Sequence, residues 1–116
     1  MYPNTTNDES SLDAMEVLVS CGIPPCLGGC AHLARAIDLY ADGMTSFMEI
    51  YRTIAKERGV EVKSALRTIT YALKHSFDLH VNLSELLHIT IPKDQVHSSL
   101  VIAQLGLYMR RRNQRK

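Results

Sequence analysis

Apolar residues recur along this chain with the spacing of amphipathic helices, most clearly between Tyr51 and Phe77. A helix predicted over 61–77 has apolar positions three and four residues apart on one side, namely Val62, Ala65, Leu66, Ile69, Ala72, Leu73 and Phe77. A shorter predicted helix ends near Arg58, followed by a glycine where helices commonly end in a left-handed residue. We expect the next residue, Val60, to fill the angle between the two helices.

The other side of the 61–77 helix is polar. It carries Lys63, Arg67, Thr70 and Lys74, with Ser64 and Tyr71 at its edge. In a helix-turn-helix, the second helix packs through one face and presents the other to the major groove of DNA. The pattern therefore fits a helix-turn-helix and, equally well, an ordinary helical hairpin with a solvated polar face.

Similar signals predict the remaining helices. Ser10 or Ser11 can cap a first helix that extends to about Cys21, and the stretch IPPCLGG after Gly22 predicts a loop. Further helices are expected at about 30–41, at 46–58 with a Ser46–Glu49 capping box, and at 82–88 with an Asn82–Glu85 cap. The last helix is expected to begin between Asp94 and Ser98, after an extended stretch at 89–92.

These elements define an all-α fold, a compact bundle of about six helices containing a helix-turn-helix. We expect a disordered tail at 1–9, one helical domain at 10–110 and a basic tail at 111–116. A chain of 116 residues is long enough to bury a hydrophobic core as a single domain.

Charge is distributed unevenly, although the formal net charge is only +1. Residues 1–62 hold four basic and nine acidic side chains, whereas residues 63–116 hold nine basic and three acidic ones. The basic part starts at the polar helix face and includes Arg110, Arg111 and Arg112. These arginines could contact DNA phosphates, or they could form a solvated tail.

Other classes of function find little support. No apolar run approaches the ~20 residues of a membrane span, and the N-terminus is too polar for a signal peptide, so we expect a cytoplasmic protein without a membrane partner. Cys21, Cys26, Cys30 and His32 lie close in sequence, but their spacing differs from the usual C-x2-C pairs of zinc sites. We expect packing cysteines and no metal or cofactor, with a metal or redox sensor as a distant option. No catalytic motif is present, so we expect no enzyme activity.

A series of residues resembles a known family. Gly22-Ile23-Pro24 followed by Leu27, Gly29, Leu33, Ala36 and Ile37 is similar to the opening of the C-terminal effector domain of stage-zero sporulation protein A, a sporulation response regulator. The resemblance continues through Ile50-Tyr51, Ile54-Ala55-Lys56, Ala65, Arg67, Ile69 and Ala72, then Leu83-Ser84, Leu86, Thr90-Ile91 and Val101-Ile102-Ala103. It covers most of residues 20–110, without the family's receiver domain.

This resemblance implies a helical effector domain that regulates transcription by binding double-stranded DNA. Arg67 stands where the family has an arginine, but Lys63, Ser64, Leu66, Thr70 and Tyr71 replace other characteristic residues, so the preferred sequence should differ. The DNA-binding residues expected are Lys63, Ser64, Arg67, Thr70, Tyr71, Lys74, Arg110, Arg111 and Arg112. A homodimer or pairing with a related regulator is the expected assembly. The alternative is a degenerate effector domain that acts as a protein–protein interaction module on a full-length regulator.

Overall fold

The computed structural model of the protein describes residues 14–114, and these residues form helices joined by loops, with no strand among them. The elements are a helical segment at 14–20, α2 Gly28–Ala41, α3 Phe47–Arg58, α4 Val62–Lys74, α5 Leu79–Leu87, the 3₁₀ turn η1 Lys93–Gln95 and α6 Ser98–Gln114. The predicted all-α class is confirmed. None of the helices within 14–114 has the length and apolar character needed to span a bilayer.

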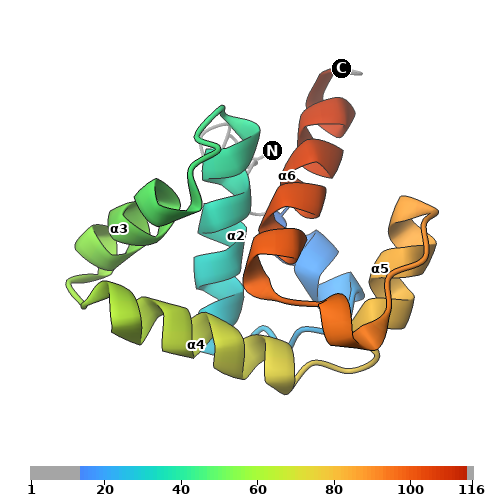
Figure 1. Cartoon of the computed structure of the whole chain (residues 1–116), viewed down its shortest axis with the longest axis horizontal. Coiled ribbons are helices and arrows are strands. Elements are labelled where there is room, and N and C mark those ends of the chain that lie inside the picture. The colour runs from blue at the N-terminus through green and yellow to red at the C-terminus, as the bar shows by residue number, and fades with distance from the viewer. Residues whose placement is uncertain (1–13, 115–116) are drawn as a thin grey trace, which may run out of the picture.

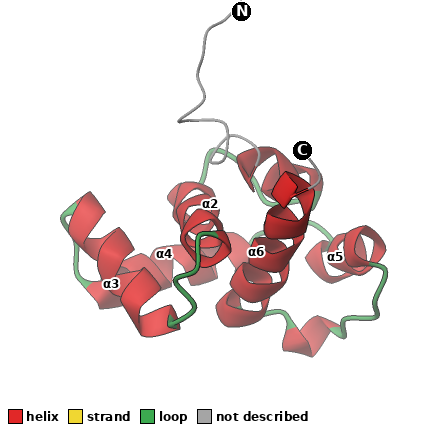
Figure 2. Ribbon diagram, turned by 90° about the horizontal axis from the view of Figure 1, so that it is seen from above, coloured by secondary structure: helices red, strands yellow, loops and turns green. Residues whose placement is uncertain are grey.

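Helix α2 lies at the centre of the bundle (Figure 1). Helices α3 and α6 lie on either side of it, α4 runs across its N-terminal end, and α5 lies beyond α6. The view from above shows the same order, with α3 and α5 at opposite sides (Figure 2). The fully buried large side chains come from most of these helices, among them Leu33, Ile37, Ile54, Ile69 and Ile102, so one core holds the bundle together.

Helix α4 packs closely against α2, and small residues make this contact possible. Its inward face consists of Ala65, Ile69 and Ala72, all fully buried. A Cβ atom added to Gly29 of α2 would lie 2.4 Å from the Thr68 carbonyl oxygen and 2.5 Å from the Ala72 Cβ. The two helices thus approach more closely than any larger residue at position 29 would allow, and the opposite face of α4 is turned to solvent.

The connection between α3 and α4 largely follows the prediction. The Ser46 hydroxyl oxygen accepts a hydrogen bond from the Glu49 backbone N–H at 3.4 Å, and Gly59 has φ +69°. The Gly59 and Val60 backbone N–H groups donate to Lys56 and Ala55, the pattern of a Schellman cap. The expectation that Val60 fills the angle between the helices is wrong, because Val60 is 44% exposed.

Helix α4 ends at Lys74, so the prediction of a helix to Phe77 is also wrong. The Ser76 hydroxyl donates to the Leu73 carbonyl at 2.6 Å, and the Phe77 backbone N–H donates to the Gly22 carbonyl at 2.8 Å. This contact with a distant turn draws the chain out of the helix. Phe77 therefore leaves the apolar stripe, and its side chain is 76% exposed.

The predicted cap at Asn82 and Glu85 is wrong as well, because α5 already begins at Leu79. The Asn82 side-chain amide donates to the Cys21 carbonyl at 2.7 Å and to the Phe77 carbonyl at 3.0 Å. Asn82 thus joins the turn at residues 21–22 to the loop after α4. A residue with ordinary N-cap chemistry serves here as a tertiary link from inside a helix.

Other boundaries lie close to their predictions. Helix α2 begins at Gly28, two residues before the predicted start, and α6 begins at Ser98, inside the predicted interval. Helix α6 extends to Gln114, so the expected domain boundary at residue 110 falls within a helix. The expected tail at 1–9 and the caps at Ser10 and Ser11 lie outside the described residues.

Candidate nucleic-acid interface

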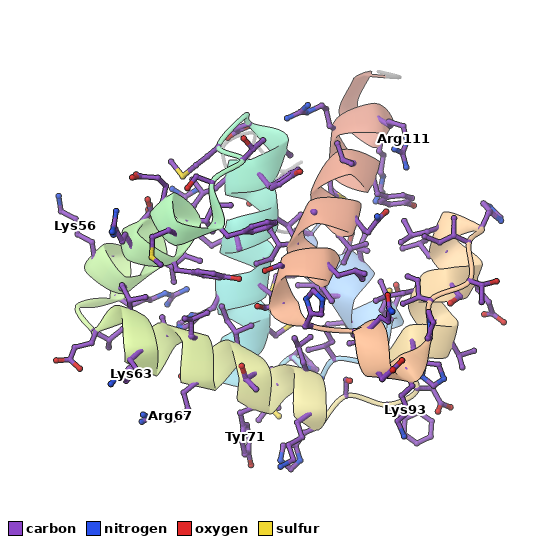
Figure 3. All side chains as sticks on the ribbon, in the orientation of Figure 1. Lys56, Lys63, Arg67, Tyr71, Lys93 and Arg111 are labelled. Atoms are coloured by element: carbon purple, nitrogen blue, oxygen red, sulfur yellow. The ribbon has the colours of Figure 1, made fainter. Side chains whose placement is uncertain are left out.

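The polar face of α4 is turned away from the core. Lys63, Arg67, Thr70, Tyr71 and Lys74 are exposed, and the sixth predicted residue of this face, Ser64, is half-buried. Lys63, Arg67 and Tyr71 project in one direction from the helix, away from the rest of the molecule (Figure 3). The helix phase inferred from the apolar spacing is therefore correct between residues 62 and 74.

The cations of this face have no carboxylate partner among residues 14–114. The ion pairs in that part of the chain join Arg35 to Glu57 at 2.8 Å and Arg52 to Glu49 at 3.6 Å, away from α4. The Arg35–Glu57 contact lowers the pKa of Glu57, chiefly through its hydrogen bonds from the guanidinium. Ion pairs thus neutralise charged side chains of α2 and α3, while Lys63, Arg67 and Lys74 of α4 remain available to an anion.

Aromatic rings lie beside these charges. The rings of Tyr71 and His75 are in tilted contact, with centroids 4.2 Å apart, and the Tyr71 side chain is 53% exposed. An exposed tyrosine can contact a thymine methyl group or donate its hydroxyl to a phosphate. His75 was absent from the sequence-based site; it is the C-cap residue of α4, one residue beyond Lys74.

The C-terminal arginines do not join this face. Arg111 lies near the end of α6, at the opposite end of the molecule from Arg67 (Figure 3). The Arg110 guanidinium donates to the Ala41 and Tyr40 carbonyls, each at 3.1 Å, and so satisfies the C-terminal end of α2. Arg112 is exposed one residue further along α6. The structure therefore divides the predicted site residues into two separate groups.

Lys93 is a residue that the sequence analysis missed. It lies in η1, is exposed, and appears on the same side of the molecule as Lys63, Arg67 and Tyr71 (Figure 3). No local signal in the IPKD stretch identifies it, because its proximity to α4 arises from the path of the chain between α5 and α6. The basic surface is therefore wider than the polar stripe of one helix.

The cysteines are separated by burial and direction. Cys21 and Cys30 are buried, which raises the pKa of both thiols, whereas Cys26 is exposed. The Cys30 thiol donates a hydrogen bond to the Met15 Sδ, with the two sulfur atoms 3.7 Å apart. Within residues 14–114, no three His, Cys, Asp or Glu side chains are grouped so that they could hold a metal ion.

Comparison with known proteins adds no relative to this description. No family model, curated protein or solved structure matches the chain.

Proposed function

We propose that this protein is a sequence-specific DNA-binding regulator of transcription, and that α4 enters the major groove of double-stranded DNA. The observation that carries this proposal is the row of Lys63, Arg67 and Tyr71, which projects outward from a helix seated closely against the core. A major groove about 12 Å wide admits an α-helix. In this interpretation α3 and α4 form the helix-turn-helix, with Gly59 at the turn.

Each side chain of the face has a role that follows from its chemistry. Arg67 is the candidate for base recognition, because its planar guanidinium matches the two acceptors of guanine in the major groove. Lys63 and Lys74 would contact DNA phosphates, and Thr70 and Tyr71 would contact bases or phosphates. Ser64 is half-buried, so its contribution is confined to the groove edge. These are binding roles, and we propose no enzyme activity for the protein.

The resemblance to the sporulation-regulator effector domain supports the same reading, since effector domains of that family bind repeated DNA sites as tandem or dimeric copies. The proposed assembly is therefore a homodimer or a pair with a related regulator on DNA. The substitutions at Lys63, Ser64 and Tyr71 imply an operator different from the family's.

The test starts with selection of a preferred site from random-sequence duplex DNA, followed by titration at two salt concentrations. Arg67→Ala should weaken binding to the selected site by about 1–3 kcal/mol and relax the preference at one base pair. Arg111→Ala is the matched control, because it removes the same exposed charge from the other end of the molecule. It should leave affinity within about a factor of two, because salt screens an exposed charge that lies far from the bound DNA.

Thermal melting of both variants checks the fold, and both midpoints should equal that of the wild type because neither side chain is in the core. Equal affinities for Arg67→Ala and the wild type would contradict base recognition by Arg67. Failure of the wild-type chain to retain any duplex at low salt would contradict the whole proposal.

That last outcome would favour the second candidate, an interaction module. A hollow of about 490 Å³ between α5 and α6 provides a surface for it, lined by Glu85, Leu86, Leu87, His88, Tyr108, Arg111 and Arg112. Arg111 belongs to this hollow and not to the α4 face. Arg111→Ala should then weaken association with a full-length regulator, measured by titration, while Arg67→Ala has no effect.

A further inference from the structure

A larger cleft, of about 690 Å³, opens beside the C-terminal end of α4. It is bounded by the end of α4, the loop before α5, the start of α5, η1 and the start of α6. Its volume lies in the range of about 300–1,000 Å³ that is usual for small-molecule sites. The cleft adjoins the polar face of α4 without coinciding with it, because Thr70 and Lys74 are the only residues of that face in the cleft lining.

Hydrogen-bond donors and positive charge dominate the polar part of the cleft. Lys74 and Lys93 enter its lining from two different elements, and neither has a carboxylate within ion-pair distance in the described part of the chain. The His97 Nδ1 accepts a hydrogen bond from the Leu100 backbone N–H at 3.4 Å, and the His97 ring also lines the cleft. The lining contains a single carboxylate, Asp78.

The position of α6 adds to this field. Ser98 is the first residue of a 17-residue helix and lies in the lining, so the positive N-terminal end of α6 borders the cleft. Two ammonium groups together with a helix N-terminus suit a group with a double negative charge. A phosphate monoester carries that charge near neutral pH.

The remaining wall is apolar, which indicates that the ligand is larger than a bare anion. Leu73, Leu79 and Val96 contribute aliphatic surface, and Phe77 contributes a ring with a side chain 76% exposed. Exposed aromatic surface of this kind gains free energy when an apolar group covers it. The lining thus combines an anion site with a surface for an organic body.

We propose that this cleft binds a small phosphate monoester with an aromatic or aliphatic body, and that the bound ligand lowers affinity for DNA. The second part rests on the proposed function: the phosphate would occupy Lys74, which a DNA phosphate also requires, and the ligand body would lie against Thr70. The first part does not depend on DNA.

The test uses phenyl phosphate as probe and backbone amide chemical shifts of the full chain as readout. Shifts should concentrate at residues 70–80 and 93–98, inorganic phosphate should bind more weakly, and phenol should produce no comparable shifts. Lys93→Gln should weaken phenyl phosphate binding by at least about tenfold, since a charge-assisted contact is lost. Lys56→Gln is the matched control, because it removes an exposed lysine from α3 (Figure 3).

Equal affinity in Lys93→Gln and Lys56→Gln, or shifts spread over all basic surfaces, would overturn the cleft as a site. In a second arm, phenyl phosphate at constant ionic strength should reduce the DNA affinity of the wild type and of Lys56→Gln, but not that of Lys93→Gln. Localised shifts without any DNA binding would refute the proposed function and leave the ligand site intact. DNA binding without localised shifts would refute the ligand site and leave the proposed function intact. Localised shifts with unchanged DNA affinity would refute the effect of the ligand on DNA binding.

Discussion

The contact between Gly29 of α2 and α4 predicts that one added methyl group displaces the proposed recognition helix. In Gly29→Ala, the new Cβ would lie 2.4 Å from the Thr68 carbonyl oxygen and 2.5 Å from the Ala72 Cβ. Neither atom belongs to a flexible side chain, because one is backbone and the other is attached directly to it. Relief therefore requires a shift of α4 relative to α2.

Overpacking of this kind costs about 1–3 kcal/mol. The neighbouring glycine provides the control: a Cβ at Gly28 would meet only the Thr68 Cγ2, at 3.5 Å, which is ordinary contact. Because alanine restricts the unfolded chain more than glycine, Gly28→Ala should be neutral or stabilising by up to about 1 kcal/mol. The two variants add the same methyl group to adjacent residues of one helix and should differ in sign.

Chemical denaturation and thermal melting measure the difference. For a chain of 116 residues, 1 kcal/mol corresponds to about 4 °C in Tm, so Gly29→Ala should melt well below Gly28→Ala. The DNA affinity of folded Gly29→Ala should fall as well, since α4 must move. If both variants melt together at or above the wild type, the close approach of α2 and α4 described above is incorrect.

Two further predictions concern other parts of the bundle. Arg110→Ala should lower the free energy of unfolding by roughly 1–3 kcal/mol in urea denaturation, because the α2 carbonyls of Tyr40 and Ala41 lose their charged donor. Arg112→Ala is the control and should be neutral, so equal costs for the two variants would refute a capping role for Arg110. Burial, and secondarily the charge of Arg58, hold the pKa of His32 below its ordinary value, so the unfolded chain binds more protons below about pH 6.5 and stability should fall there. His32→Leu, which also removes a buried Nδ1 without a hydrogen-bond partner, should reduce this loss of stability at low pH. Denaturation curves at about pH 5 and pH 7.5 measure it, and a wild-type stability unchanged between these values would refute the prediction.

The parts of the fold that the sequence predicted are those with local causes. The Ser46 cap, the left-handed Gly59 and the amphipathic phase of α4 each depend on residues within one or two turns of a helix. The same holds for the exposure of Lys63 and Arg67, because a helix phase that buries Ala65 and Ile69 leaves those two on the outside.

The errors at Phe77 and Asn82 have causes that are distant in sequence. Phe77 leaves the helix because its backbone N–H bonds to Gly22, and Asn82 is drawn into tertiary links in place of capping. Arg110 caps α2 from α6, although its place in an arginine run suggested a solvent-exposed or DNA-binding role. Such contacts join residues 55 or more positions apart, and no window of local pattern contains them.

The contacts that hold α4 in place explain why substitutions on its exposed face leave the fold intact. The helix is held before its start by the Gly59 cap, near its middle by the contact with Gly29, and after its end by the Phe77–Gly22 hydrogen bond. Each of these depends on backbone atoms or on glycine, and none uses an exposed side chain of α4. Substitution at Lys63, Arg67 or Tyr71 can therefore alter what the helix binds at little cost in stability.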